Sequence, residues 1–205
     1  MKRILILLVV MSALTGCATL PKGAVSACLV ERSQLSFFAQ GEKLVAFRMT
    51  AITGDYGLDG ILQIKKQATD QYEVTVFSNV GAYRLLQATV TREAVQYAYL
   101  APGVNHTAVQ IKVERFLNLL LISPQSQGVC RATREGAQVN YKHPIKKYSY
   151  VSNNTYPIKL TGPKAFGKVH FLFEQYEPHG EVQLPQVLHY QDGKIQVDLT
   201  LLRLK

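Results

Sequence analysis

Histidines, carboxylates and cysteines are the side chains of this sequence that could do chemistry, and the first two classes show no spacing typical of a site. The five histidines, His106, His143, His170, His179 and His189, include no pair four residues apart and no neighbour of a cysteine at metal-site spacing. Among the 14 acidic residues, no pair is framed by the apolar segments that paired-carboxylate catalysis needs. No Gly-x-Ser-x-Gly sequence is present either. We therefore expect no catalytic residue, no metal ligand and no cofactor, and interpret the protein as not an enzyme.

The cysteine at position 17 ends a segment that has the order of an export signal. The basic start Lys2-Arg3 is followed by the apolar run 4–11, which is too short to span a bilayer. Leu14-Thr15-Gly16-Cys17 resembles the bacterial lipobox. The resemblance implies diacylation of the Cys17 thiol, cleavage before Cys17 and acylation of the new amine, so residues 1–16 are the predicted lipoprotein signal peptide. An ordinary signal peptide that contains a cysteine is the alternative.

The residues after this cysteine bear on where the lipid anchor inserts. Ala18 rather than Asp follows Cys17, which in lipoproteins of enteric type resembles the signal for the outer membrane. We therefore expect a lipid-anchored protein on the periplasmic face of the bacterial outer membrane. Residues 17–34 contain Pro21 and Gly23 and lack a sustained apolar period, so we interpret them as the lipidated N-terminus and a tether.

The two remaining cysteines, Cys28 and Cys130, would share an oxidising compartment after export, where a disulfide can persist. A bridge between them would join the N-terminal segment to the middle of the domain. Two separately buried cysteines are an equally good interpretation, because a free thiol packs as a small apolar side chain. The sequence leaves both alternatives open.

Length and composition indicate one folded domain over residues 35–205. Hydrophobic residues make up 47% of the 205-residue chain and charged residues 18%, which are values typical of globular proteins. The formal net charge of +9 is scattered along the sequence. A periplasmic location argues against nucleic acid as a partner, while anionic lipid head groups or envelope glycans fit a basic surface. A solvated basic surface without a partner is the alternative.

Alternation of apolar and polar residues begins at Leu44 and predicts a half-buried strand. Val45, Phe47 and Met49 fall on one face of it. Residues 53–60 hold three glycines and predict a hairpin connection. They do not form a phosphate-binding loop, because the segment that follows alternates like a strand and offers no helix N-terminus.

Further short strands follow in close succession and indicate an antiparallel meander. In the last of them, Val95, Tyr97 and Tyr99 are expected to share a face. The predicted ranges are 61–66, 72–77, 83–90 and 95–99.

The period changes to that of a helix after Pro102-Gly103. Asn105 or Thr107 can cap the helix, and Pro124 forbids its continuation. Its apolar side chains recur at offsets of four, three and four: Val109, Val113, Phe116 and Leu120. A helix this apolar is expected to be covered on most sides.

The chain returns to strands after the helix. Residues 125–144 are polar and predict only short strands, whereas the last part of the chain gives the clearest alternation. Asp192-Gly193 predicts a tight hairpin before the terminal strand. The predicted strands cover 147–151, 156–160, 169–173, 187–190 and 195–201.

These elements together predict an α+β, mostly β, single domain, which is an incomplete antiparallel β-barrel covered or plugged by one or more helices. A curled sheet that turns one apolar face inward and does not close forms a concave slot. A helix laid into that slot either lines it or plugs it. A filled core without a cavity is the alternative, and the pattern does not separate the two.

The order of elements resembles the LolA/LolB-like superfamily of bacterial periplasmic and outer-membrane lipid carriers, including its small lipoprotein branch. The resemblance spans residues 40–205 and rests on the lipobox, the meander, the turn Phe77-Ser78-Asn79-Val80-Gly81, the apolar helix and Leu184-Pro185 before the C-terminal strands. It implies an unclosed antiparallel barrel with helices as a lid over a hydrophobic cavity. It also implies that the cavity receives acyl chains from a partner carrier or hands them to the outer membrane.

The turn at residues 77–81 departs from the family pattern. In the lipoprotein-receptor branch it typically reads Gly-Pro-Leu-Gly, and the Leu is the residue assigned to membrane contact. Here Val80 takes the place of Leu, while Ser78 and Asn79 replace Gly and Pro. The resemblance therefore implies Val80 as the membrane-contact residue of a related carrier rather than of the receptor itself.

The expected function is that of an outer-membrane lipoprotein that binds the acyl chains of a lipoprotein, glycolipid or phospholipid in a hydrophobic cavity, for carriage or membrane insertion. Its expected partners are the outer membrane, an acyl ligand and a periplasmic carrier protein, and we expect a monomer. A structural or assembly lipoprotein without a ligand cavity and an envelope enzyme are the alternatives. The expected cavity-lining residues lie on inward strand faces and on the helix: Phe47, Met49, Leu62, Ile64, Val74, Val76, Phe116, Leu120, Phe171 and Phe173.

Overall fold

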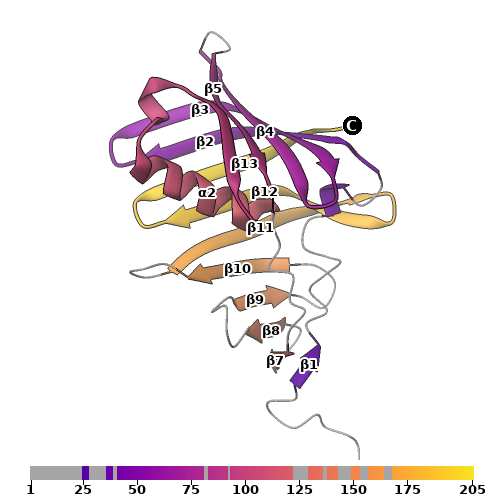
Figure 1. Ribbon diagram of the computed structural model, residues 1–205. Helices are drawn as coiled ribbons and strands as arrows, with labels where there is room; N and C mark the ends of the chain where they lie inside the picture. Colours follow the sequence, from indigo (N-terminus) through magenta and orange to yellow (C-terminus); the bar gives the residue numbers. More distant parts are fainter. Residues whose placement is uncertain are drawn as a thin grey trace, which may run out of the picture.

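The structure is a computed structural model that describes residues 25–27, 36–38, 41–80, 83–91, 93–121, 129–135, 138–142, 149–152, 157–163 and 168–205. Within these ranges the chain forms 13 β-strands, the helix α2 (Thr107–Leu121) and two short 3-10 helices, η2 (Ser36–Phe38) and η3 (Pro102–Val104) (Figure 1). The strands are β1 (Val25–Ala27), β2 (Leu44–Thr53), β3 (Tyr56–Ala68), β4 (Gln71–Ser78), β5 (Arg84–Val90), β6 (Val95–Leu100), β7 (Val129–Glu135), β8 (Gln138–Lys142), β9 (Ser149–Ser152), β10 (Pro157–Pro163), β11 (Lys168–His179), β12 (Val182–Asp192) and β13 (Ile195–Leu204).

All of these strands join one antiparallel sheet in the order β1-β7-β8-β9-β10-β11-β12-β13-β2-β3-β4-β5-β6. Strands β2–β6 form one meander and β7–β13 a second. The two meanders meet where β13 pairs with β2, with Leu199 opposite Met49. The edge strands β1 and β6 do not pair with each other, so the sheet stays open. The prediction of an incomplete antiparallel β-barrel with a helix is confirmed.

The helix α2 lies inside the curl of the sheet. Figure 1 shows the sheet curving around α2, while β7, β8, β9 and β1 continue below the curled part. The helix contacts β5 near one edge of the sheet and packs Phe116 against Phe171 of β11 and Tyr190 of β12. It therefore bridges the two meanders across the concave face.

Alternation in β2 sorts its side chains between the two faces of the sheet, as the sequence predicts. Val45, Phe47 and Met49 are buried, whereas Arg48 is exposed. Phe47 lies between Leu62 of β3 and Leu201 of β13 in the register of the sheet. The inward face of each strand thus contributes to one shared core.

The expected connection at residues 53–60 is wrong in length, because the turn is much tighter. Thr53 pairs with Tyr56, and Gly54 adopts a φ of +60° between them, as the first central residue of a two-residue hairpin does. The later glycines belong to β3. Gly60 suits a strand here because a Cβ at this position would collide with the backbone carbonyl oxygen of Phe77 on β4.

The expectation that Tyr99 shares a face with Tyr97 is also wrong. The register shifts within the β5–β6 pair, so that Ala88 faces Tyr97 while Gln87 faces Tyr99. One extra residue on β6 therefore turns Tyr99 away from the core, and Tyr97 remains on the inward side. Alternation alone cannot reveal such a bulge.

The helix begins and ends close to the predicted positions. A turn at η3, where the amide of Val104 donates to the carbonyl of Ala101, redirects the chain after β6. Asn105 Oδ1 accepts a hydrogen bond from Gln110 Nε2 at 3.0 Å near the start of α2. No helix in the described ranges has the length and apolarity to cross a membrane.

The N-terminal segment touches the sheet at its far edge. Val25–Ala27, which lie within the predicted tether, form β1 and pair with β7. Cys130 of β7 is the register partner of Ser26 in this pair. Cys17 and Cys28 lie outside the described residues, so lipidation at Cys17 and a bridge from Cys28 to Cys130 stay predictions.

Candidate functional site

The candidate site is the concave face of the sheet beneath α2, and its lining is apolar. Inward residues of β2–β5 and β10–β13 meet the last turns of the helix in one continuous cluster. Nine of the ten predicted lining residues are buried in this cluster, and Val76 is half-buried against it. The structure therefore brings all ten together. That they line a ligand cavity stays a prediction.

Aromatic rings gather where the helix crosses β11 and β12. The Phe116 ring lies edge-on to the Tyr190 ring at 5.1 Å between centroids and stacks on the Phe171 ring at 5.9 Å. Phe171 also stacks on Phe173 at 5.3 Å. Such pairs stabilise by about 0.5–1.5 kcal/mol beyond the burial of their area. The second half of α2 is thus fixed to the C-terminal meander by ring packing.

A buried ion pair borders this aromatic cluster. Arg115 of α2 donates through Nη1 to Asp192 Oδ2 at 2.5 Å. The Asp192 side chain is fully buried, and 26% of the Arg115 side chain is exposed. A carboxylate removed from water needs such a partner, since an uncompensated buried charge costs several kcal/mol. The pair also joins the helix to β12 at a defined point.

Tyr190 lies between this ion pair and the apolar cluster. Its side chain is 1% exposed, and its hydroxyl lies beside the Asp192 carboxylate, which serves as its hydrogen-bond acceptor. Burial and, second, the negative charge of Asp192 raise the pKa of Tyr190. The hydroxyl is therefore a protonated donor that faces the interior of the site.

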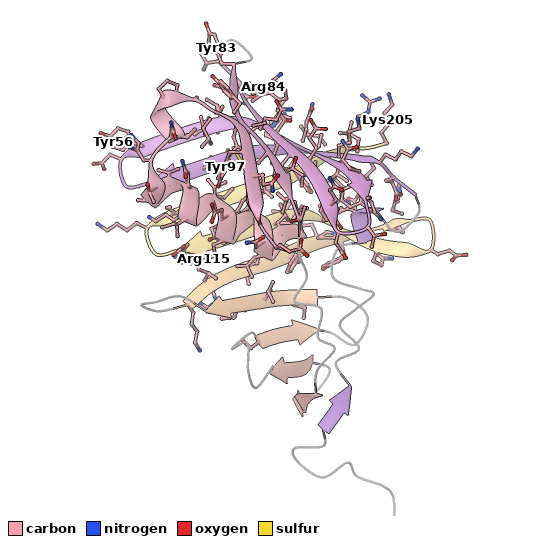
Figure 2. The ribbon with its side chains drawn as sticks, in the orientation of Figure 1. Tyr56, Tyr83, Arg84, Tyr97, Arg115 and Lys205 are labelled. Carbon is pink, nitrogen blue, oxygen red and sulfur yellow. The ribbon has the colours of Figure 1, made fainter. Side chains whose placement is uncertain are left out.

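The first half of α2 meets the sheet at β6 through a different tyrosine. Tyr97 Oη donates to the backbone carbonyl of Gln110 at 3.2 Å. Burial and, second, the charge of Glu114 raise the pKa of Tyr97. Figure 2 shows Tyr97 above the helix and Arg115 below it. Polar contacts thus flank the apolar site.

Tyr190, Asp192 and Arg115 are not among the residues predicted from the sequence. Asp192 belongs to the predicted Asp192-Gly193 hairpin, and the turn indeed follows it, with Gly193 at a φ of +65°. A signal was present, because Leu188, Tyr190 and Asp192 alternate along β12 and therefore share its inward face. A carboxylate on the buried face of a strand needs a cationic or hydrogen-bonding partner.

The four histidines in the described part of the chain lie apart from this site. His189 Nδ1 is 2.7 Å from Asp198 Oδ1, and His179 Nε2 is 2.8 Å from Glu42 Oε1. Burial and the neighbouring Lys159 and Lys168 lower the pKa of His170. His106 is exposed, and His143 lies outside the described residues. Within the described ranges, no group of three or more possible ligands is arranged to hold a metal ion.

Comparisons with known proteins bear on the fold. No protein-family model matches the sequence, and no curated protein matches it. A crystal structure of a LolA superfamily protein from Nitrosomonas europaea superposes with a TM-score of 0.55 at 11% identity, covering 82% of this chain and 87% of that chain. The fold is LolA/LolB-like. A DUF1329 family protein from Desulfovibrio piger gives a TM-score of 0.42 at 10% identity, over 86% of this chain and 87% of that one.

The LolA/LolB-like fold confirms the fold predicted from the resemblance. At 11% identity it shows the architecture alone. The function has to be argued from the concave face, the helix over it and the exposed hairpins of this chain.

The hairpin between β4 and β5 exposes apolar side chains at its tip. Val80 is 79% exposed and Tyr83 is 69% exposed. Figure 2 shows Tyr83 projecting from the tip of the molecule, away from the sheet. The hairpin is held by backbone bonds from Ser78 to Tyr83 and from Asn79 to Asp59. A membrane contact through Val80 stays a prediction.

Proposed function

We propose that this protein is an outer-membrane lipoprotein that binds acyl chains beneath α2 for carriage or membrane insertion. The supporting observation is the continuous apolar surface that eight strands present under one helix in a sheet that does not close. The LolA/LolB-like fold agrees with this proposal. Water exclusion by such a surface is the only chemistry that the binding of an acyl chain needs.

Burial of the chain supplies the binding free energy. Each CH₂ group removed from water contributes about 0.8 kcal/mol, so a 16-carbon chain contributes on the order of 10 kcal/mol before ordering costs. Uptake and release then need an opening, and α2 is the element that covers the concave face. In this proposal the helix moves to admit the chain.

Anchoring would come from the N-terminal segment. Lipidation of Cys17 after removal of residues 1–16 would hold the protein on the periplasmic face of the outer membrane, with residues 17–34 as the tether and residues 35–205 as the carrier domain. A periplasmic carrier protein would deliver the ligand, and the exposed Val80 hairpin would contact the bilayer during transfer. Acyl groups from a lipoprotein, glycolipid or phospholipid all fit this proposal.

The direct test is native mass spectrometry with lipid extraction on the mature chain carrying Cys17→Ser, which keeps all described residues. We expect an acyl lipid to co-purify in near-stoichiometric amount, or to bind after incubation with phospholipid and acylated peptide. A mass that stays that of the free protein in every case would contradict the proposal. That result would favour a structural or assembly lipoprotein with a filled core.

A matched pair of variants on α2 locates the binding site. Phe116→Asp places a carboxylate beneath the helix, whereas Asn118→Asp places the same group on its exposed side. We expect Phe116→Asp to abolish uptake and Asn118→Asp to retain it. Thermal unfolding checks that both variants fold. If Phe116→Asp does not fold, the pair Phe116→Ala and Asn118→Ala takes its place. Equal uptake by both members of a folded pair would contradict the site.

A further inference from the structure

The outer face of the sheet, on the side away from α2, gathers basic residues that are far apart in the sequence. Arg48 is exposed on this face, because its neighbours Phe47 and Met49 point into the core. Residues that pair in the register share a face, so the row that contains Arg48 can be followed from strand to strand. From β2 to β5 this row contains Arg48, Ile61, Phe77 and Arg84. An arginine thus stands on each side of an apolar pair.

Two more cations lie in the adjoining rows of the same face. Arg203 of β13 pairs with Ala46 of β2, two positions from Arg48, and Lys65 of β3 pairs with Leu44. The Arg203 and Lys65 side chains are both exposed. Neighbouring strands lie about 4.8 Å apart, so the cations are spread over about 15–20 Å of the outer surface. Four residues make up this basic face: Arg48, Lys65, Arg84 and Arg203.

The carboxylates nearby do not neutralise the basic face. None of its four cationic groups forms an ion pair within the described part of the chain. Arg84 donates only to the neutral Oε1 of Gln87, at 2.7 Å. Glu73 lies opposite Lys65 in the register, but its carboxylate accepts hydrogen bonds from Gln67 and Gln87. Four cations against one such carboxylate leave the face positive and open to an anionic partner.

Exposed apolar side chains accompany these cations. Leu202, beside Arg203, is 47% exposed, and Tyr99 is 43% exposed where the same face ends at β6. Tyr83 directly precedes Arg84 and is 69% exposed, and Figure 2 shows both at the upper end of the molecule. Cations mixed with aliphatic and tyrosine side chains are typical of surfaces that lie on a bilayer. There the cations meet phosphates, and the apolar groups enter the head-group region.

The spacing of the cations selects the kind of anion. Groups spread over about 15–20 Å cannot converge on one phosphate ion, whereas the phosphates of a membrane surface can meet all of them at once. Near an anionic bilayer, each Lys or Arg strengthens binding about 5-fold. A surface of anionic lipids therefore fits the basic face better than a small soluble anion.

We propose that the basic face binds the phosphates of anionic phospholipid head groups, so that the domain lies with the outer side of its sheet against the bilayer. The acyl site lies beneath α2, on the other side of the same sheet. This inference therefore goes beyond the proposed function and does not depend on it. The Val80 hairpin, which leads into Arg84, borders the basic face and reaches the same bilayer.

Titration with vesicles tests this surface on the mature chain carrying Cys17→Ser, which has no lipid anchor. The vesicles contain phosphatidylethanolamine with either phosphatidylglycerol or phosphatidylcholine, and flotation measures the bound fraction. We expect the chain to bind the phosphatidylglycerol vesicles more tightly than the phosphatidylcholine vesicles. This preference should weaken as the salt concentration rises, because salt screens exposed charges.

A matched pair of double variants locates the contact. Arg48→Gln with Arg203→Gln removes two cations of the basic face and should weaken binding to phosphatidylglycerol vesicles about 25-fold. Lys168→Gln with Lys194→Gln removes the same charge at exposed positions, at the start of β11 and in the turn before β13. We expect this control to weaken binding by less than about 3-fold. Thermal unfolding checks that all four substitutions leave the fold intact.

The outcomes separate this inference from the proposed function. Equal weakening in both double variants would show that only net charge matters and would overturn the basic face. Failure of the parent chain to bind phosphatidylglycerol vesicles would also overturn it, and an acidic protein surface would then be the occupant that the charge favours. Uptake of an acyl probe in solution should be the same in the parent chain and both double variants. If the parent chain takes up no probe but still binds anionic vesicles, the proposed function is wrong and this inference stands.

Discussion

The two halves of α2 are held by very different contacts. In the first half, Thr107, Ala108 and Ile111 are exposed, and one hydrogen bond joins the Gln110 carbonyl to Tyr97. In the second half, the apolar side chains are buried in the core, and Arg115 is paired with Asp192. The helix is therefore loosely held where it begins and firmly held where it ends.

This difference indicates which part of α2 can move away from the sheet. Five apolar residues of the second half are buried, and each contributes about 1.5–3 kcal/mol by leaving water. Lifting that half would consume most of the 5–15 kcal/mol by which a typical domain is stable. In the first half, Val113 packs against the core but is only half-buried, so lifting this half costs less. Opening is therefore expected where α2 begins, next to η3, rather than over the whole helix.

Breaking the ion pair should have the largest effect on stability. Arg115→Ala removes the Arg115 cation from beside the fully buried Asp192 carboxylate, and we expect the free energy of unfolding to fall by about 3–5 kcal/mol. Urea unfolding followed by circular dichroism measures the change. Replacing both residues, as Arg115→Met with Asp192→Leu, should recover much of the loss. A fall below about 1 kcal/mol in Arg115→Ala would show that the pair does not fix this half.

Matched apolar truncations compare the two halves of the helix directly. Leu120→Ala removes a buried side chain and should cost about 2–5 kcal/mol. Ile111→Ala removes a side chain that is 50% exposed and should change stability by no more than about 0.5 kcal/mol. Hydrogen exchange should show weaker protection over residues 107–114 than over 115–121. Equal costs and uniform protection would contradict the difference between the halves.

Alkaline pH probes the tyrosines that meet each half. Below the ordinary tyrosine pKa of 10.0, Tyr190 is protonated in both the folded and the unfolded chain. Above it, the unfolded chain loses the proton while the raised pKa of Tyr190 keeps the folded chain protonated. The free energy of unfolding should therefore fall as pH rises, by at most about 1.4 kcal/mol per pH unit for each such tyrosine.

Replacing each tyrosine with phenylalanine divides this pH dependence between Tyr190 and Tyr97. Tyr190→Phe should reduce the slope above pH 10.0 more than Tyr97→Phe, because the Tyr190 side chain is more deeply buried. Urea unfolding at a series of pH values gives both slopes. An identical slope in Tyr190→Phe and the parent chain would mean that the Tyr190 hydroxyl reaches solvent.

Much of the fold follows from alternation in the sequence. The inward rows of β2 and β11 are readable because a period of two in Val45-Phe47-Met49 and Val169-Phe171-Phe173 reports one buried face. The bulge that turns Tyr99 outward is not readable, because it depends on the pairing of β5 with β6. Local pattern thus gives the faces but not the shifts in register.

The apolar part of the site was equally accessible from the sequence, and its polar end was not. The ten predicted lining residues are all apolar, and each lies on an inward face or on α2. Asp192 directly precedes a tight turn, where a carboxylate is usually solvated. Its burial depends on Arg115, which is 77 positions away in the sequence and reaches it only after the helix crosses the sheet. A contact between residues so far apart in the sequence depends on the tertiary structure and cannot be predicted from local alternation.

The smallest effect on stability is expected at the hairpin beside the loosely held half of α2. The amide of Ala101, just before η3, donates to the Leu85 carbonyl on the strand that leaves this hairpin. Val80 is 79% exposed, so Val80→Asp should change the free energy of unfolding by less than about 0.5 kcal/mol.

If opening occurs at this end of the molecule, Val80→Asp should also weaken vesicle association and slow transfer of a bound acyl ligand to vesicles, while uptake in solution stays the same. Flotation with phosphatidylethanolamine–phosphatidylglycerol vesicles and a fluorescent acyl probe measure both quantities, with the equally charged Asn118→Asp as the control on the exposed side of the helix. Transfer that is equally fast in both variants would place the exit elsewhere on the concave face, because the hairpin and the first half of α2 would then open onto solvent rather than onto the bilayer.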